Sequence, residues 1–258
     1  MTTYRTPDNK KIYRQAGKRW AYDPYPTKSY TFARNGCGCC AVLHCIIERE
    51  KYKNYTPASI RPYMVQFATK GHGTEWRGIT EALKHYGLKN VKNVDITEAF
   101  DLMKKGDRVA VFLFTNKKGP DGTVWTTGGH YVAVVGYKVV NGKHYFYMKD
   151  SGGRKHDGWY QYEKSMKGCI RRIWIGQLPD EIELPSKGYW ALGDKSPEII
   201  KIQKFLKAKG YYKGKIGTKT GRIGKLTDQA IRKWQKASGL VVDGKWGPKC
   251  NAECEAQK

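Results

Sequence analysis

Three observations predict an α+β domain followed by a small all-α domain in this chain of 258 residues. In the first part, segments with helical spacing precede a series of strand-like segments, which is the order expected of helices packed on an antiparallel sheet. The C-terminal part shows helical spacing and an internal repeat. Between the two parts, Pro179 and Pro185 flank three acidic residues in an otherwise basic chain. We therefore predict a first domain over 1–180, a linker over 181–194 and a second domain over 195–258.

The elements of the first domain follow from the spacing of its apolar residues. An apolar segment over 41–47 predicts a helix over 38–50, and residues 77–86 also show helical spacing. Apolar runs bounded by turn residues predict four strands, at 108–115, 131–140, 144–149 and 170–175. Because the helices come first and the strands follow, we expect one antiparallel sheet covered by helices.

The second domain begins with a helix whose limits are marked by typical residues. Ser196 and Pro197 suit an N-cap and a first helical position, and Gly210 suits a helix end. A second helix is predicted from Thr227 to Gly239. Five residues of the first helix recur 29 positions later: Ile202, Lys204, Lys207, Ala208 and Gly210 return as Ile231, Lys233, Lys236, Ala237 and Gly239. Two copies predict a compact pseudo-symmetric domain, since a solenoid needs more repeats.

The composition predicts a folded protein with a polyanionic partner. The content of 40% hydrophobic and 13% aromatic residues is ample for a core. No stretch approaches the roughly 18 apolar residues of a membrane span, and the polar residues 1–10 do not resemble a signal peptide, so we expect synthesis in a cytoplasm and no membrane insertion. The net charge of +25, spread over both halves, suits nucleic acid, an anionic membrane or the anionic polymers of a bacterial wall.

Seven cysteines are present, and four of them lie between Cys37 and Cys45. This spacing is unlike a secreted disulfide framework, so we expect free thiols. The Cys-x-Cys-Cys pattern with His44 lacks the paired Cys-x-x-Cys motifs of a structural zinc site, and we predict neither a metal nor another cofactor. Cys39, Cys40 and Cys45 are interpreted as small apolar core residues.

Cys37 is the candidate nucleophile, because a cysteine at the first turn of a helix has its thiolate stabilised by free N–H groups and the helix dipole. Gly36 and Gly38 are expected to let a substrate backbone come close. A general base and an orienting carboxylate follow later in the chain, as His130 at the start of one predicted strand and Asp150 at the end of the next.

Residues just before His130 are candidates for substrate contact. Gly129 belongs to the Gly-Gly-His turn, and Trp125 lies shortly ahead of it. For Trp125, a place in the substrate groove and a place in the aromatic core are equally compatible with the sequence.

The loop at 140–143, Val-Asn-Gly-Lys, can form either of two turns, and the choice decides where Asp150 lies. A two-residue Asn-Gly turn pairs Ala133 with Asp150 and places the carboxylate on the face opposite His130. A type I turn with a G1 bulge pairs Val132 with Asp150, on the same face as His130. We predict the bulged turn, with the Asp150 carboxylate bonded to Nδ1 of His130.

The second domain resembles the three-helix peptidoglycan-binding domains over residues 197–250. The shared features are Ile202-Gln203, Gly210-Tyr211-Tyr212, Trp234-Gln235, Gly239-Leu240 and Asp243-Gly244-Lys245-Trp246-Gly247. The chain departs from the pattern in the first turn, where Lys215-Ile216-Gly217 lacks the aspartate. This resemblance implies a wall-binding role, with Tyr211, Tyr212, Trp246 and Asp243 as the candidate contact residues.

Residues 11–175 resemble the papain-like cysteine peptidases of the bacteriocin-leader-processing group, in the variant found in cell-wall hydrolases. Gly36-Cys37-Gly38, Gly129-His130 with Gly136-Tyr137, and Asp150 fall on that group's motifs. Cys39-Cys40 replaces the usual Pro-Thr, which leaves Cys40 as the rival nucleophile. Papain-like enzymes also use an upstream glutamine as an oxyanion donor, and the nearest upstream glutamine here is Gln15. The backbone N–H of Cys37 is the second candidate donor.

Together these features predict a monomeric peptidoglycan hydrolase that cleaves an amide bond of the stem or cross-bridge peptide. A phage endolysin, made in the host cytoplasm and acting on the wall after release, fits the expected lack of an export signal. Two alternatives remain. One is an N-acetylmuramoyl-L-alanine amidase with the same nucleophile, and the other is a non-catalytic basic protein that binds the cell wall. The wall-binding repeat argues against nucleic acid as the partner.

Overall fold

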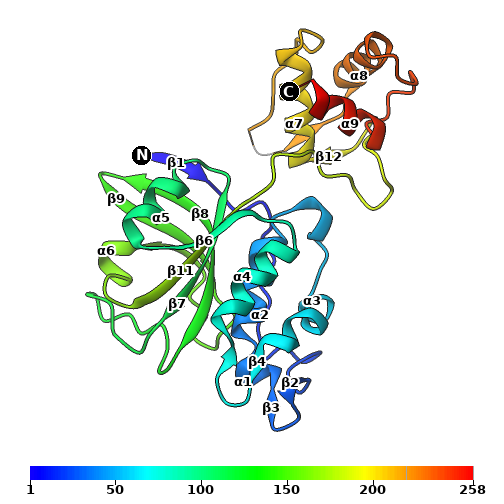
Figure 1. The fold of residues 1–258 in the computed structure, drawn as a ribbon. Coiled ribbons are helices and arrows are strands. Elements are labelled where there is room, and N and C mark those ends of the chain that lie inside the picture. Colours follow the sequence, from blue (N-terminus) through cyan, green and yellow to red (C-terminus); the bar gives the residue numbers. More distant parts are fainter. Residues whose placement is uncertain (219, 258) are drawn as a thin grey trace. The chain divides into compact units, whose positions relative to one another are not determined.

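The computed structural model describes residues 1–218 and 220–257, and it divides the chain into two compact units (Figure 1). The first unit contains Met1–Glu48 and Tyr52–Pro179, and the second contains Arg49–Lys51 and Asp180–Lys258. The predicted α+β class, with an antiparallel sheet in the first part and helices in the second, is confirmed.

A seven-stranded sheet organises the first unit. Six strands follow the order β10-β9-β8-β7-β11-β6, every pair is antiparallel, and β1 pairs with β8. The bounds are β1 (Thr2–Arg5), β6 (Lys89–Val94), β7 (Arg108–Phe114), β8 (His130–Val140), β9 (Lys143–Lys149), β10 (Gly158–Gln161) and β11 (Ile170–Gln177). The long strand β8 shares one edge between two partners, since its first half pairs with β7 and its second half with β1.

Helices and loops cover the sheet on both faces, because β7 is buried at every residue and alternates its side chains between two cores. Val109, Val111 and Leu113 face the core that contains α2 (Cys37–Ile46), α3 (Pro57–Met64) and α4 (Trp76–His85). The opposite core receives Ala99 and Met103 of α5 (Ile96–Met103). Figure 1 shows α2, α3 and α4 on one side of the sheet and α5 with α6 (Tyr162–Ser165) on the other.

Short elements complete this unit. They are β2 (Pro24–Thr27), β3 (Tyr30–Thr31), α1 (Phe32–Asn35), β4 (Ala68–Thr69), β5 (Gly73–Thr74) and the 3-10 turn η2 (Val65–Phe67). A second 3-10 turn, η1, spans Glu50–Tyr52. The four predicted strands and both predicted helices are present within a few residues of their expected limits. The polar edge strand β6 was not predicted, because its sequence Lys-Asn-Val-Lys-Asn-Val has few apolar residues.

The turn between β8 and β9 differs from the prediction. Asn141 and Gly142 both have positive φ angles, 49° and 72°, and Val140 pairs with Lys143, which makes a two-residue turn. The predicted G1 bulge at this turn is therefore wrong. The ladder shifts instead at Val135, between the pairs Val134–Met148 and Gly136–Tyr147. This bulge restores the register that the turn alone would have displaced, so that Ala133 pairs with Lys149 and not with Asp150.

The second unit packs three helices around an aromatic core. They are α7 (Pro197–Ala208), α8 (Lys225–Ala237) and α9 (Pro248–Ala256), with a small ladder of β12 (Lys195–Ser196) and β13 (Gly221–Arg222). Ser196 caps α7 by accepting the Glu198 N–H, as its sequence position predicted. The segment expected to be a linker over 181–194 instead joins this core, since Ile182 and Trp190 are buried in it.

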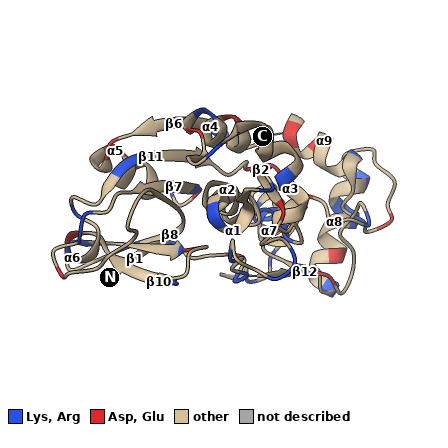
Figure 2. Cartoon of the chain, turned by 90° about the horizontal axis from the view of Figure 1, so that it is seen from below, with Lys and Arg blue, Asp and Glu red and all other residues tan. Residues whose placement is uncertain are grey.

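Basic residues are found in both units. Lys and Arg, blue in Figure 2, lie on both units. Of the helices that the structure describes, none combines the length and apolarity needed to cross a membrane.

Candidate active site

Cys37 is the first residue of α2 and lies half-buried beside a groove. Its backbone N–H is among the amides that a helix start leaves without a helical partner. The His130 side chain and the backbone N–H groups of Tyr131 and Gly38 lie close enough to the sulfur to favour its thiolate, against the effect of burial on the thiol pKa. The start of α2, together with the first residues of β8, thus surrounds one sulfur with donors.

His130 and Asp150 meet because β8 and β9 are neighbours. His130 opens β8, Asp150 directly follows β9, and their Nε2 and Oδ1 atoms lie 2.6 Å apart. The carboxylate has further donors. Oδ1 accepts the Gly152 N–H at 2.7 Å, and Oδ2 accepts the His156 N–H at 3.1 Å. Asp150 is fully buried, and these bonds hold its charge in place.

The predicted contact of Asp150 with Nδ1 of His130 is wrong, because the bond is made by Nε2. Since Asp150 occupies Nε2, Nδ1 is the ring nitrogen left to serve the Cys37 thiol, which lies near enough to His130 to raise the pKa of the imidazole. The bulge at Val135, rather than a bulge at the turn, sets the strand register that brings Asp150 to this place. Asp150 thus orients the ring from the side opposite the thiol.

The pKa shifts favour an ion pair between Cys37 and His130. Burial alone would raise the pKa of the Cys37 thiol, but His130 and the backbone N–H groups of Tyr131 and Gly38 together outweigh it, so that pKa is lowered. Burial alone would lower the pKa of His130, but Asp150 and Cys37 raise it to about 10. Burial likewise opposes ionisation of Asp150, yet the bonds from His130 and His156 hold its pKa well below the usual value. These shifts favour a Cys37 thiolate paired with a His130 imidazolium over the neutral thiol and imidazole.

Cys40, the rival nucleophile, lies in a different environment. It is completely buried, and burial raises the pKa of its thiol well above the usual range. Cys39 and Cys45 are also buried in the core under α2, with raised pKa values for the same reason. Their interpretation as small core residues is confirmed by this burial.

Gln15, the candidate oxyanion donor, has its amide engaged elsewhere. Its Nε2 donates to the Ala33 carbonyl at 2.7 Å, and its Oε1 accepts from the Ser151 hydroxyl at 3.2 Å. Two side-chain amides line the groove, those of Asn116 and of Asn35, which lies two residues before Cys37. Asn35 Nδ2 donates one hydrogen to the Tyr25 carbonyl at 3.2 Å. Gln15 keeps a second amide hydrogen, so its oxyanion role stays a prediction, and Asn35 joins it as a candidate.

Of the predicted substrate-contact residues, the structure places only Gly129 in the groove. Gly36 and Gly38 are buried, and a Cβ atom would come within 2.6 Å of the Phe32 carbonyl oxygen at Gly36 and 2.5 Å of the Thr74 hydroxyl at Gly38. These two glycines therefore permit close packing around the start of α2, and their expected contact with substrate is wrong.

Trp125 is a core residue, so of its two possible places the one in the groove is wrong and the one in the aromatic core is confirmed. It is 1% exposed, stacks on Phe114 with ring centroids 4.2 Å apart, and donates its indole N–H to the Ser165 carbonyl. Two further rings lie beside it, those of His156 and Tyr160, at centroid distances of 4.7 and 5.1 Å. Trp125 therefore supports the loop that carries His156.

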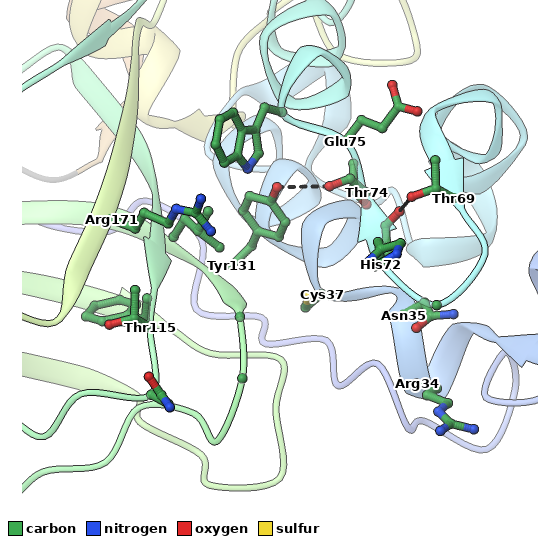
Figure 3. Close-up of a pocket in the computed structure, with 18 of the residues that line it drawn as sticks. Arg34, Asn35, Cys37, Thr69, His72, Thr74, Glu75, Thr115, Tyr131 and Arg171 are labelled. Carbon is green, nitrogen blue, oxygen red and sulfur yellow. Dashed lines mark hydrogen bonds between the residues drawn. The ribbon is translucent and has the colours of Figure 1, made fainter.

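A groove of about 880 Å³ lies in front of Cys37 (Figure 3). In Figure 3, Tyr131 and Arg171 lie on one side of Cys37, and Asn35 and His72 lie on the other. The Tyr131 hydroxyl donates to the Thr74 carbonyl at 2.9 Å and thus ties the sheet side of the groove to the helical side. An extended chain can pass across Cys37, because lining residues are present on both sides.

Three residues that the sequence analysis left out hold Asp150 in position. His156 faces the second carboxylate oxygen, with Nδ1 at 3.3 Å from Oδ2. Asp157 accepts the Asp150 N–H at 3.0 Å and forms an ion pair with Arg14, which also donates to the Asp150 carbonyl. For His156, the position six residues after Asp150 was the one available signal, and it does not reveal that the loop folds back.

In the second unit, two of the predicted wall-contact residues are buried. Trp246 is 0% exposed and stacks on Trp234, and Tyr212 is 7% exposed with its hydroxyl bonded to the Lys215 carbonyl. Their prediction as exposed stacking residues is wrong, because a unit of this size needs its aromatic rings for its core. Tyr211 is half-exposed, and its wall contact stays a prediction.

Asp243 is exposed and lines a second cavity, of about 460 Å³, within this unit. Tyr189, Leu240, Val241 and Lys245 line the same cavity. The Asp243 carboxylate also accepts hydrogen bonds from Gln235 Nε2 and the Lys245 N–H, at 2.9 and 2.8 Å. This cavity is lined mainly by exposed and half-exposed side chains, unlike the buried aromatic rings.

Among the described residues, no group of three or more His, Cys, Asp or Glu side chains is arranged to hold a metal ion. All seven cysteines are free thiols. What the first unit brings together is a nucleophile, a base and an orienting carboxylate, which is the arrangement of a cysteine peptidase.

Comparison with known families agrees with this class. Residues 25–175, more than half of the chain, match the Peptidase C39-like family, and the protein belongs to that family. Residues 195–252 match the peptidoglycan binding domain family. A crystal structure described as a C39-like peptidase from Bacillus anthracis is 12% identical, covers 69% of this chain and 98% of its own, and superimposes with a TM-score of 0.42. A search among curated proteins found no match.

Proposed function

We propose that the protein is a peptidoglycan hydrolase that cleaves an amide bond in the stem or cross-bridge peptide of the bacterial wall. The observation that carries this proposal is the Cys37–His130–Asp150 arrangement beside an open groove, in a chain that also contains a peptidoglycan-binding domain. The peptidase family supports amide hydrolysis, and the binding domain supports the wall as the place where it happens.

The proposed reaction uses only groups that surround Cys37. The thiolate attacks the amide carbonyl carbon and forms a carbon–sulfur bond, while the carbonyl oxygen becomes an oxyanion that the Cys37 N–H stabilises. The carbon–nitrogen bond then breaks, and the leaving amine takes the proton of the His130 imidazolium. Neutral His130 next removes a proton from water, which attacks the thioester. The products are a carboxylate and the regenerated thiolate.

Within this proposal we infer an endopeptidase. Support comes from the groove, whose lining residues lie on both sides of Cys37 and so can hold peptide on both sides of the scissile bond. The alternative is an N-acetylmuramoyl-L-alanine amidase with the same catalytic groups. Mass spectrometry of digested muropeptides separates the two, since an endopeptidase exposes a new amine on a stem or cross-bridge residue. An amidase instead frees the lactyl group of the sugar from the peptide.

A non-catalytic wall-binding protein is the competing class. Zymography on purified walls, with wild type beside Cys37→Ala, distinguishes it from an enzyme. Clearing by wild type alone supports the proposal. Wall binding without clearing by either protein would contradict it.

We further propose that the protein is a phage endolysin that reaches the wall through a separate membrane pore. The basic charge of +25 and the binding domain suit an enzyme that stays on the anionic wall after release. Expression in a bacterium whose walls the purified protein digests provides the test. We expect lysis only when the membrane is permeabilised as well, and lysis without permeabilisation would contradict this route.

A further inference from the structure

Arg171 lies at a β-bulge beside the candidate active site. Along the β11–β7 ladder, Ile170 pairs with Phe114 and Arg172 pairs with the adjacent Leu113, so Arg171 is the extra residue. In a regular strand, successive side chains point to opposite faces. A bulge changes this direction for the residue it contains, and such bulges often re-aim a side chain next to a functional site.

The bulge brings two consecutive arginines to one indole ring. The Arg171 guanidinium carbon lies 4.9 Å from the centroid of Trp76, and that of Arg172 lies 3.9 Å from it. Arg172 is also held by a hydrogen bond to Asn93 Oδ1, at 2.7 Å. Arg171, in contrast, lines the groove that contains Cys37. Stacking on Trp76 restricts the Arg171 side chain without using its N–H donors, which remain available to a ligand.

The groove has more positive than negative groups. Arg34, Arg77 and Arg171 line it, and in the part of the chain that the structure describes, no carboxylate forms an ion pair with any of the three. Glu75 is the one Asp or Glu among the described lining residues. Figure 3 shows its carboxylate pointing away from Cys37.

Among the described residues of the same unit, Arg5, Arg14, Arg61 and Arg108 have carboxylate partners, and Arg19, Arg154 and Arg172 do not. What distinguishes Arg171 is therefore its combination of the groove, the bulge and the indole ring. Arg5 pairs with Glu48 at 2.9 Å, and Arg61 pairs with Asp23 at 3.2 Å. An arginine that is placed by a bulge, stacked on an aromatic ring and left without an acid in a groove has the features of a binding group for an anion.

We propose that Arg171, positioned by the bulge and Trp76, binds a free carboxylate of the peptide substrate next to the bond that Cys37 attacks. This inference rests on the proposed function, and it specifies an acidic peptide as the substrate class. The planar guanidinium matches a carboxylate with two parallel N–H donors, whereas a carboxamide offers one acceptor and no charge. Peptidoglycan stem peptides meet this requirement, because they carry free carboxylates close to their amide bonds.

The test compares two forms of one substrate. Peptidoglycan is freed of its anionic polymers by acid, and half of it is treated with carbodiimide and ammonia to convert its carboxylates to carboxamides. Hydrolysis by the full-length wild type, Arg171→Gln, Arg171→Lys and Arg19→Gln is then measured on both forms. Arg19 is the matched control, because it is an exposed arginine of the same unit that does not line the groove.

We expect wild type and Arg19→Gln to prefer the free carboxylate form by about 10- to 100-fold in kcat/KM, the range of a charged hydrogen-bonded pair. Arg171→Gln is expected to lose this preference, mainly through KM, with little change on the amidated form. Arg171→Lys should retain part of it. Equal rates of wild type on both forms, or an equal loss on both forms for Arg171→Gln, would overturn the inference and leave the hydrolase assignment intact.

A binding measurement separates failure of this inference from failure of the proposed function. Full-length Cys37→Ala is titrated calorimetrically with soluble muropeptides in free and amidated form, with and without Arg171→Gln. Tighter binding of the free form that disappears with Arg171→Gln supports the inference even if wild type digests no wall. Equal binding of both forms contradicts it.

Discussion

The two units of this protein use their buried polar groups for different ends. In the first, the buried side chains of His130 and Asp150 converge on the half-exposed Cys37 beside the larger cavity. In the second, the buried amide of Gln235 binds Asp243 and the Lys245 carbonyl, and so holds a loop onto helix α8. Substitution of a buried polar group should therefore reduce activity in the first unit and stability in the second.

The largest expected effect on activity is that of replacing Cys37, and a matched change at a buried cysteine separates activity from stability. Cys37→Ala removes the nucleophile and should lower wall hydrolysis at least ~10³-fold, with the circular dichroism spectrum unchanged. Cys40→Ala is the matched change three residues later. It should change activity less than about tenfold and cost about 1 kcal/mol of stability, because Cys40 is buried packing. Turbidity assays and thermal melts measure both, and loss of activity with Cys40→Ala alone would reverse the assignment.

Asp150→Asn should rank next, because it keeps the shape of the side chain and removes its charge. We expect a fall in kcat of about 10²- to 10⁴-fold. Activity requires the Cys37 thiolate, present above its lowered pKa, and the His130 imidazolium, present below its pKa of about 10. The pH profile of kcat/KM should therefore be bell-shaped.

The alkaline limb of that profile identifies the role of Asp150. Because the carboxylate raises the pKa of His130, its removal should move this limb to lower pH. His156→Gln is the milder companion change, since His156 bonds to Oδ2 of Asp150, whereas His130 is bonded to Oδ1. A fall of about threefold to tenfold is expected there. An alkaline limb that does not move in Asp150→Asn would exclude Asp150 as the group that raises the His130 pKa.

In the second unit, a buried and a half-exposed aromatic residue should separate stability from binding. Trp246→Ala removes a fully buried ring and should cost about 3–5 kcal/mol of unfolding free energy. Tyr189→Ala, at the cavity, should leave the melting temperature nearly unchanged and weaken wall binding about fivefold. Calorimetry and pull-down on purified walls provide the two readouts. Unchanged wall binding with Tyr189→Ala would place the contact surface elsewhere.

The smallest effects compare two turn glycines with the same φ angle of 72°. An added Cβ at Gly142, in the turn between β8 and β9, meets nothing within 4 Å, so Gly142→Ala should cost about 1 kcal/mol from the backbone alone. At Gly244 the Cβ would come within 2.2 Å of an Asp228 oxygen, and Gly244→Ala should cost about twice as much. Equal losses in denaturant titrations would show that the loop at Gly244 adapts.

The sequence predicted those parts of the molecule in which local pattern and chemistry agree. The helix that begins at Cys37 and the strands around His130 and Asp150 follow from apolar spacing. Their nucleophile, base and carboxylate were expected to lie together, because the three have complementary roles in catalysis. The strand register was predictable only in part. The turn has the Asn-Gly geometry that its residues favour, and the compensating bulge at Val135 has no sequence signal, since it depends on packing across the sheet.

The aromatic residues were the least predictable, because the same ring suits a core and a binding surface. Trp125 and Trp246 were candidates for contact with a ligand, and both are buried among core side chains. The arginines of the groove gave no signal either, because Arg34, Arg77 and Arg171 are far apart in a basic sequence. Long-range placement, rather than residue type, decides such roles.

Selective alkylation tests most directly whether Cys37 is the activated nucleophile. At pH 6 an ordinary thiol is almost fully protonated, whereas a thiolate paired with His130 reacts with iodoacetamide. The other six cysteines are buried. Peptide mapping of the native protein at partial modification should find one label, on Cys37, in proportion to the activity lost. A label on Cys40 instead, or full activity in protein labelled at Cys37, would contradict the account.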